Sequence, residues 1–245
     1  MSVIYVSRYR ALNVVSRKVK PAEIVLDLGP GICPQAFVKP RIHICIDAHR
    51  PYLERLNQKL RKNRRYVLIN AKWDQVITML PDKSVDTVFA LDFIEHLEKA
   101  EGLKMLREAE RVARRQIVVG TPQGFYPQSY EDPNKPDRWG MGGGYWQTHR
   151  SGWDFEDFGD RWDIVCCPDF LKLDEDGQPM EQPIGAIWAI RNLSMDSVRD
   201  GAPSAARAPF DVVRTILQQG LPPIAFDGLR SAWLALLDVT HRAPH

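Results

Sequence analysis

The sequence predicts an α/β fold built on a mostly parallel sheet, and three observations support it. Seven short β-branched or aliphatic runs alternate with helix-like stretches, as in βαβ units. One intervening stretch, residues 101–113, spaces its apolar residues as an amphipathic helix does. The last two runs are joined by a turn-rich segment at 174–177. The expected strands are residues 23–28, 42–46, 66–69, 85–91, 116–120, 162–166 and 184–190.

Composition limits the possible classes of protein. The 245 residues are 44% hydrophobic and 26% charged, which is typical of a globular protein with a core. A formal charge of +2 gives no whole-chain field for nucleic acid, so no nucleic-acid partner is expected. No apolar run reaches the ~20 residues of a transmembrane segment, and arginines interrupt residues 1–20, so no signal peptide is expected. Cys33, Cys45, Cys166 and Cys167 show no CxxC spacing, which favours reduced thiols in a cytoplasmic protein.

Two stretches break the alternation. Residues 123–152 form a long segment rich in proline, glycine and aromatic residues, a length typical of a binding element or lid. Residues 192–210 are expected to be a linker, and residues 211–245 a helical C-terminal extension with two amphipathic stretches. We therefore expect one domain over residues 1–191 with a substrate lid at 123–152. The extension would contact a partner protein or form a homodimer.

The most informative residues follow the first predicted strand. Asp27, Gly29 and Gly31 lie where that strand ends, and a helix is expected to follow. Glycines let the backbone approach a ligand, and a helix N-terminus offers N–H groups to a negative group. Asp47 closes the next strand, 20 positions after Asp27, where an acidic side chain accepts the hydroxyls of a ribose. The pattern indicates a nucleoside-containing cofactor.

A nicotinamide cofactor is the competing interpretation. Its fingerprint has a third glycine for helix–strand packing, whereas this chain has Pro34. Asp27 would also bring a carboxylate close to a pyrophosphate. S-adenosylmethionine, with a free amino group, a cationic centre and a ribose, suits these residues better. The structural alternatives are that Asp27 caps a helix and that Asp47 is a turn residue.

These segments, together with Asn70-Ala71 and residues 85–97, resemble the class I S-adenosylmethionine-dependent methyltransferases. The likeness is closest to a subgroup whose fourth strand runs into a D-x-x-E-H-L segment, here Asp92 to Leu97. It covers Val19 to Ile190 and implies a Rossmann-like, doubly wound, seven-stranded sheet with an antiparallel final hairpin. One departure is Cys33, where many members have a third glycine.

The resemblance also implies cofactor-binding residues, at the ends of the first four predicted strands. They are Asp27, Gly29, Gly31, Asp47, Asn70, Ala71, Leu91 and Asp92. By this likeness, the first three would hold the methionine end and Asp47 the ribose. The pair at 70–71 would surround the adenine, with Trp73 or Asp74 nearby, and the last two would lie beneath the cofactor.

Methyl transfer needs few catalytic residues, because the cofactor supplies the reactivity. His149, near the end of the 123–152 segment, is the candidate catalytic base, since an unperturbed histidine pKa near ~6.5 suits proton acceptance at neutral pH. The alternative is that His149 or Ser151 caps the next helix. His96 is favoured as a structural or cofactor-orienting residue. The six histidines lie in no ligand-spaced cluster, so no metal is expected.

The acceptor can be narrowed by exclusion. Enzymes that methylate base nitrogens or glutamine amides resemble one another in an N/D-P-P-Y/F tetrapeptide, which residues 91–94 do not match. Aromatic residues edged by polar ones in the 123–152 segment suit a sugar or another polar ring. We expect O-methylation of a small polar molecule or of a saccharide or glycan hydroxyl. The alternative is a methyltransferase-like protein without catalysis that acts as a scaffold.

Overall fold

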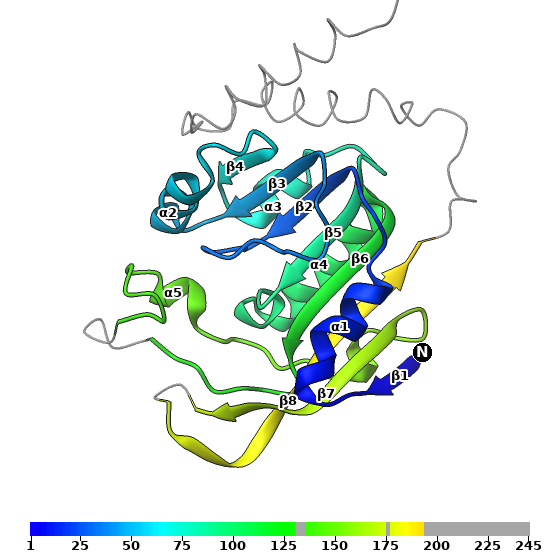
Figure 1. Ribbon diagram of the computed structural model, residues 1–245, viewed down its shortest axis with the longest axis vertical. Coiled ribbons are helices and arrows are strands. Elements are labelled where there is room, and N and C mark those ends of the chain that lie inside the picture. Colours follow the sequence, from blue (N-terminus) through cyan, green and yellow to red (C-terminus); the bar gives the residue numbers. More distant parts are fainter. Residues whose placement is uncertain (131–135, 175–176, 194–245) are drawn as a thin grey trace, which may run out of the picture.

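The computed structural model describes residues 1–130, 136–174 and 177–193, and in these residues it contains one mixed sheet of eight strands (Figure 1). The strands are β1 (Ser2–Tyr5), β2 (Ile24–Leu28), β3 (Ile42–Asp47), β4 (Tyr66–Asn70), β5 (Val85–Leu91), β6 (Ala113–Pro122), β7 (Asp163–Leu173) and β8 (Pro179–Asn192). Their order across the sheet is β1-β7-β8-β6-β5-β2-β3-β4.

The strand directions confirm a Rossmann-like, doubly wound arrangement. β2 pairs in parallel with β3 on one side and β5 on the other, so the order of connection reverses there. β8 is antiparallel to both β6 and β7, which confirms the expected final hairpin. The expectation of seven strands was wrong by one, because β1 adds to the sheet edge in parallel with β7. This short, mostly exposed segment has little apolar pattern of its own, and its strand form comes from the pairing.

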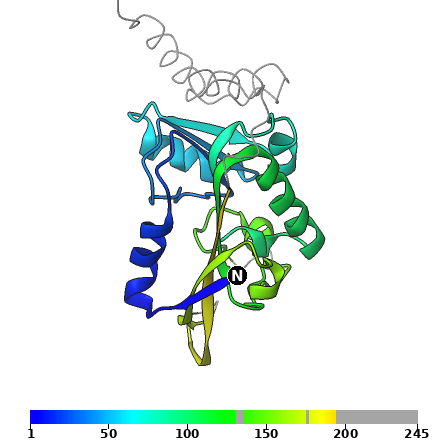
Figure 2. The ribbon, with the colours of Figure 1, turned by 90° about the vertical axis from the view of Figure 1, so that its right-hand side faces the viewer.

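Helices cover both faces of the sheet. They are α1 (Arg8–Lys18), α2 (Arg50–Leu60), α3 (Trp73–Ile77) and α4 (Lys99–Val112). The described residues also include the short helix α5 (Gly144–Gln147) and two 3-10 turns, η1 (Ile94–His96) and η2 (Phe155–Asp157). Figure 2 shows α1 and α4 on opposite sides of the sheet. Successive residues of a strand face opposite sides. Leu26 and Leu28 of β2 therefore pack with α3 and α4, while Val25 packs with α1.

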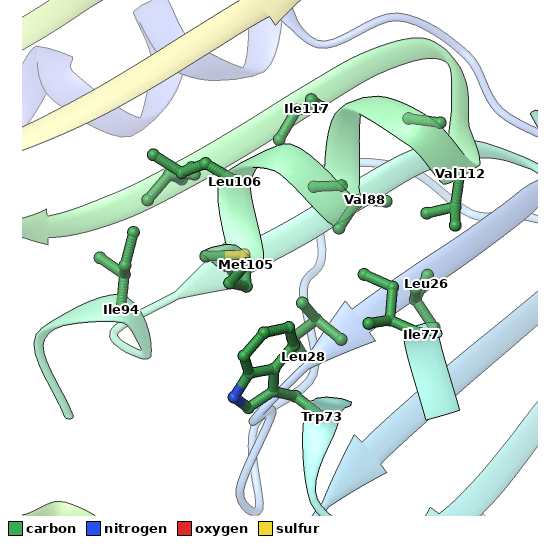
Figure 3. Close-up of a cluster of buried hydrophobic side chains, with 14 of the residues drawn as sticks. Leu26, Leu28, Trp73, Ile77, Val88, Ile94, Met105, Leu106, Val112 and Ile117 are labelled. Atoms are coloured by element: carbon green, nitrogen blue, oxygen red, sulfur yellow. The ribbon is translucent and has the colours of Figure 1, made fainter. Parts of the chain in front are cut away.

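The larger core lies between the sheet and the α3–α4 layer (Figure 3). In α4, Met105, Ala109 and Val112 are fully buried at helical spacing, whereas Leu103, expected on this face, is 37% exposed. The side chains labelled in this core are Leu26, Leu28, Trp73, Ile77, Val88, Ile94, Met105, Leu106, Val112 and Ile117. This layer fixes the strand ends from which the candidate site is built.

The helix expected after the glycine loop is absent, which corrects the sequence prediction. Residues 29–41, between β2 and β3, contain no helical residue. Pro30, Pro34 and Pro40 stand in this stretch, and proline lacks the N–H that a helix interior needs. The loop therefore has no helix N-terminus to offer a negative ligand group.

The C-terminal predictions concern residues that lie outside the described part of the chain. Asn192 is the last residue of β8, and the structure describes nothing of the linker beyond residue 193 or of the extension at 211–245. Among the described residues, no helix combines the length and apolar character that crossing a membrane requires. All four cysteines are free thiols, as expected.

Gly102 of α4 tests the packing of this core. A Cβ at Gly102 would lie 2.3 Å from Cζ2 of Trp153, a fully buried ring. Alanine gains up to about 1 kcal/mol in helix propensity, but overpacking costs about 1–3 kcal/mol. We expect Gly102→Ala to lower the free energy of unfolding in urea by about 1 kcal/mol. Combined with Trp153→Phe, the same change should cost less, and an equal cost in both backgrounds would contradict this packing.

Candidate functional site

A cavity of about 210 Å³ opens where β2, β3, β4 and β5 end. Its lining includes residues at or just beyond the end of each of these strands, among them Gly31, Asp47, Ala71 and Asp92. In open α/β sheets, ligands bind beyond the carboxyl ends of the strands at the point where the strand order reverses. Here that point lies between β2 and β5, and α5 lies opposite these strand ends (Figure 1).

Asp47, at the end of β3, is the central acidic group of this cavity. Its Oδ2 accepts a hydrogen bond from Gly31 N at 3.0 Å, and its Oδ1 accepts one from His49 N at 2.8 Å. Burial raises the pKa of Asp47 to about 6, although the two N–H bonds act in the opposite direction. A carboxylate has about four acceptor positions, so Asp47 retains capacity for hydroxyl donors in the cavity.

The two glycines of the loop are required both by conformation and by space. Gly29 has φ 61° and Gly31 has φ 53°, in the left-handed region that favours glycine. A Cβ on Gly29 would lie 2.1 Å from the Phe93 ring, and one on Gly31 would lie 2.2 Å from the Trp139 ring. The glycine loop therefore packs against two aromatic rings, both of which line the cavity.

Asp27 is not among the residues that line the cavity. Its Oδ2 accepts from Gln35 N at 2.9 Å and lies 3.0 Å from Nε2 of His43, and both side chains are buried. In this structure Asp27 anchors the proline-containing loop to β3, the element paired with its own strand. Contact between Asp27 and a cofactor stays a prediction.

The residues expected around the adenine divide into two groups. Ala71 lines the cavity, whereas the Asn70 side chain donates to the carbonyls of Asp47 and Ala48 at 2.9 and 3.0 Å. Asn70 thus holds the turn after β3 rather than facing the cavity. Trp73 and Asp74, at the start of α3, are both part of the lining.

The two residues at the end of β5, Leu91 and Asp92, lie in different surroundings. Asp92 lines the cavity with φ 47°, and the residue is exposed there. A non-glycine residue with positive φ is uncommon and marks a locally constrained backbone. Leu91 instead packs in the core on the α1 face of the sheet and does not line the cavity.

The described part of the 123–152 segment forms one wall of the cavity. Asp137 holds this wall, because its carboxylate accepts from the N–H groups of Trp139 at 2.8 Å, Met141 at 3.1 Å, and Gly143. Burial alone would raise the pKa of Asp137, but these N–H bonds lower it below its usual value. Trp139 packs edge-on against Tyr52 with ring centroids 4.7 Å apart. Tyr145, Trp146, Gln147 and Arg150 complete the wall.

His149 contacts His96 and is not among the residues that line the cavity. The two ring centroids lie 4.8 Å apart, and His96 does line the cavity. Burial lowers the pKa of His96 to about 3, with a further contribution from His149, so His96 is neutral at physiological pH. Glu95 joins them, and one ligand atom from each of the three residues lies within 4.8 Å of the others. Sequence spacing missed this group because His149 is distant along the chain.

Main-chain hydrogen bonds bring these distant residues together. The carbonyl of Glu95 accepts from Arg150 N at 2.8 Å and from Ser151 N at 3.1 Å. Ser151 Oγ donates to the carbonyl of Leu97 at 2.8 Å and accepts from Nε1 of buried Trp153 at 2.9 Å. Segment 148–153 is thereby fixed against η1.

The alternative in which Ser151 or His149 caps the following helix is wrong. The next helical turn is η2, and the N-cap residue there is Asp154, whose Oδ1 accepts from Phe155 N at 2.8 Å. Ser151 bonds instead to the turn that contains Glu95. His149, Ser151 and Trp153 therefore lie in a segment that docks against η1.

Residues 26–118 match the model of a protein family described as a methyltransferase domain. Over this segment, which is less than half of the chain, the sequence resembles a methyltransferase domain. The matched segment runs from β2 into β6, so it contains the glycine loop, Asp47 and the Glu95-His96 turn of the cavity region. It ends before the wall formed by the 123–152 segment, which this methyltransferase family model does not describe. A search of curated proteins finds no match.

Several solved structures resemble this chain at low identity. A putative methyltransferase from Bacillus halodurans C-125 is 14% identical, with a TM-score of 0.49, over 75% of this chain and 97% of its own. The N-methyltransferase NodS from Bradyrhizobium japonicum WM9 is 13% identical, with a TM-score of 0.47, over 76% and 94%. Magnesium protoporphyrin IX methyltransferase from Synechocystis PCC 6803 is 14% identical, with a TM-score of 0.43, over 75% and 76%. None of these likenesses is close enough to indicate a substrate.

Asp137→Asn tests how the cavity wall is held. An amide oxygen accepts more weakly than a carboxylate, so the turn at 139–143 should open more often. We expect faster hydrogen–deuterium exchange at residues 139–143, with exchange of β2 and β5 unchanged. Asp160→Ala, an exposed substitution in another loop, is the control. Unchanged exchange at 139–143 would mean that Asp137 does not hold this wall.

Proposed function

We propose that this protein transfers a methyl group from S-adenosylmethionine to a hydroxyl of a small polar molecule or saccharide. The observation that carries the proposal is the buried Asp47 carboxylate, which borders a cavity beyond the carboxyl ends of β2 to β5. This cavity is built largely from the segment that matches a methyltransferase domain. The cofactor is S-adenosylmethionine, and the proposed acceptor is a small molecule rather than a nucleic acid.

The residues present fit the nucleoside part of this cofactor. The Asp47 carboxylate, with acceptor capacity left, is suited to the two ribose hydroxyls. Ala71, Trp73 and Asp74 border the same cavity one strand away, which gives the adenine an apolar surface and a polar edge. Glycine at positions 29 and 31 lets the cofactor lie close to the loop.

The surroundings available for the methionine end differ from the glycine loop and helix N-terminus expected from the sequence. The N–H groups of Gly29 and Gly31 donate to the Ile46 carbonyl at 2.8 Å and to Asp47, and residues 29–41 contain no helix. The methionine would instead lie beside Asp92 and the rings of Phe93 and Trp139. This arrangement favours the second candidate function, a methyltransferase-like scaffold without catalysis, and binding measurements separate the two.

The reaction is an in-line displacement that needs positioning more than functional groups. The acceptor oxygen forms a bond to the methyl carbon, the bond from sulfur to that carbon breaks, and the electron pair stays on sulfur as a neutral thioether. The hydroxyl proton passes to a base, for which His149 stays our candidate. Tyr145, Trp146 and Arg150 border the cavity and offer the mixed aromatic and polar lining that suits a sugar ring.

Calorimetry with S-adenosylhomocysteine, adenosine and NAD tests the cofactor. We expect S-adenosylhomocysteine to bind and NAD not to bind. Asp47→Ala should weaken binding by about ten- to a hundredfold, the effect of about 1.5–3 kcal/mol for a hydrogen bond to a charged group. Asp160→Ala should leave the affinity unchanged.

The pH dependence of the same binding follows from the pKa of Asp47. Because that pKa is raised to about 6, the carboxylate is ionised above this pH and protonated below it. Affinity for S-adenosylhomocysteine should therefore fall as pH drops from 7.5 to 5, and the fall should be smaller in Asp47→Ala. Equal affinity of folded wild type and variant would remove Asp47 from the ribose site. No binding of S-adenosylhomocysteine by the wild type would favour the scaffold.

His149→Gln tests the catalytic base. Glutamine keeps much of the hydrogen bonding but does not accept a proton usefully. With a saccharide or phenolic acceptor that supports turnover, the variant should bind S-adenosylhomocysteine normally and turn over at least ~100-fold more slowly. Near-wild-type turnover would show that His149 is not the base.

A further inference from the structure

We propose that Glu95, His96 and His149 form a binding site for one divalent first-row transition metal ion at the edge of the cavity. One ligand atom from each residue lies within 4.8 Å of the other two. Ligands about 2.0–2.2 Å from a common metal lie within about 4.4 Å of one another, so a small closure completes the site. Neither the methyltransferase match nor the expected cofactor assigns a metal to these residues.

The histidine rings have the backbone partners that metal-binding histidines have. Nδ1 of His149 lies 2.8 Å from the Tyr126 carbonyl, and Nδ1 of His96 lies 3.3 Å from the Thr148 carbonyl. A carbonyl accepts from a protonated Nδ1, which leaves the lone pair of the ring on Nε2. Metal-ligating histidines almost always donate their other N–H to such a partner, which fixes the tautomer and the ring orientation.

The third ligand is the buried carboxylate of Glu95, one oxygen of which has no hydrogen-bond partner in the part of the chain that the structure describes. Glu95 is 2% exposed, and its Oε2 has no hydrogen-bond partner among the described residues. A buried carboxylate oxygen without a partner is costly, and buried charges are normally paired or bound to a metal. A cation between Glu95 and the two imidazoles would supply the missing partner.

The framework around these ligands is fixed before any cation binds. Glu95 and His96 belong to η1, and the Glu95 carbonyl accepts from the N–H groups of Arg150 and Ser151. These bonds set the position of His149, the residue before Arg150, relative to η1. Ligands held by their own backbone contacts lose little entropy when a metal binds.

The ligand set selects the class of cation. Two imidazoles and one carboxylate suit Zn²⁺, Co²⁺, Mn²⁺ or Fe²⁺, whereas Mg²⁺ and Ca²⁺ prefer oxygen ligands. Three protein ligands leave coordination positions open, and His96 lines the cavity. An oxygen of the acceptor would take one of these positions. This last point rests on the proposed function, whereas metal binding itself does not.

A second cluster, of Asp27, His43 and Cys45, shows the contrast. Its three side chains are buried, and His43 already pairs with Asp27 at 3.0 Å. None of the three lines the cavity. This cluster gives a matched control, because Cys45→Ser alters it and leaves Glu95, His96 and His149 in place.

Titration with Co²⁺ tests the site, because its visible absorption reports coordination by nitrogen and oxygen without any turnover. We expect the full-length wild type to bind one Co²⁺ in the cavity-edge site. Glu95→Gln and His149→Gln should each weaken binding by at least ~10-fold, since even second-shell partners change metal affinity ~10–100-fold. Cys45→Ser and Glu98→Gln, which changes an exposed carboxylate nearby, should leave binding unchanged.

The outcomes separate this proposal from the proposed function. Failure of the wild type to bind Co²⁺, Mn²⁺ or Zn²⁺ would overturn the metal site, as would equal Co²⁺ binding by Glu95→Gln and His149→Gln. Calorimetry with S-adenosylhomocysteine in the presence of a chelator tests the cofactor site separately. A metal on Nε2 would occupy the lone pair with which His149 accepts a proton, so His149 cannot hold the ion and act as the base at the same time. If His149 is the base and not a ligand, His149→Gln leaves Co²⁺ binding intact, and the metal site is again overturned.

Discussion

The carboxylate and the carbonyl of Asp47 join the ends of three neighbouring strands, and the shape of the cavity depends on this junction. The carboxylate accepts from Gly31 in the loop after β2 and from His49 after β3. The carbonyl accepts from the Asn70 side chain at 2.9 Å and from Ala71 N at 3.1 Å after β4. These bonds hold the glycine loop in place, and in this chain no helix follows that loop. The left-handed conformation of Gly31 is held by the same group that faces the cavity.

A second junction forms the opposite side of the site. The Glu95 carbonyl binds the backbone of residues 150–151, so the turn after β5 and the segment after α5 become one unit. Trp153 holds this unit against α4. Its fully buried ring lies against Gly102 of α4, and its Nε1 donates to Ser151. The placement of His149 beside His96 therefore depends on how Trp153 packs in the core. A substitution at Gly102 would therefore also shift the residues at the edge of the cavity.

The sheet could be predicted from the sequence because its signals are local. The apolar runs, the glycines after β2 and Asp47 at the end of β3 are each visible within a short stretch of sequence, and the structure bears out the strands they predict. The helix after the glycine loop was wrongly expected, because Pro30, Pro34 and Pro40 lack the N–H groups that a helix interior needs. β1 was missed because an edge strand of four residues takes its form from pairing. The grouping of Glu95, His96 and His149 depends on hydrogen bonds between segments far apart in the chain. No spacing rule contains that information.

Burial of the ionised Asp47 carboxylate at the cavity lowers the stability of the folded protein. Its pKa is raised from 3.8 to about 6 by burial, so the ionised form is less stable in the folded protein than in the unfolded chain. This penalty is fully present above pH 6 and disappears as pH falls below about 4, and it amounts to about 3 kcal/mol at neutral pH. Two backbone N–H bonds already offset part of the desolvation, and hydroxyl donors from a bound ribose would offset more. A buried carboxylate kept at this cost at the edge of a cavity is consistent with the ligand-binding role that we propose for Asp47.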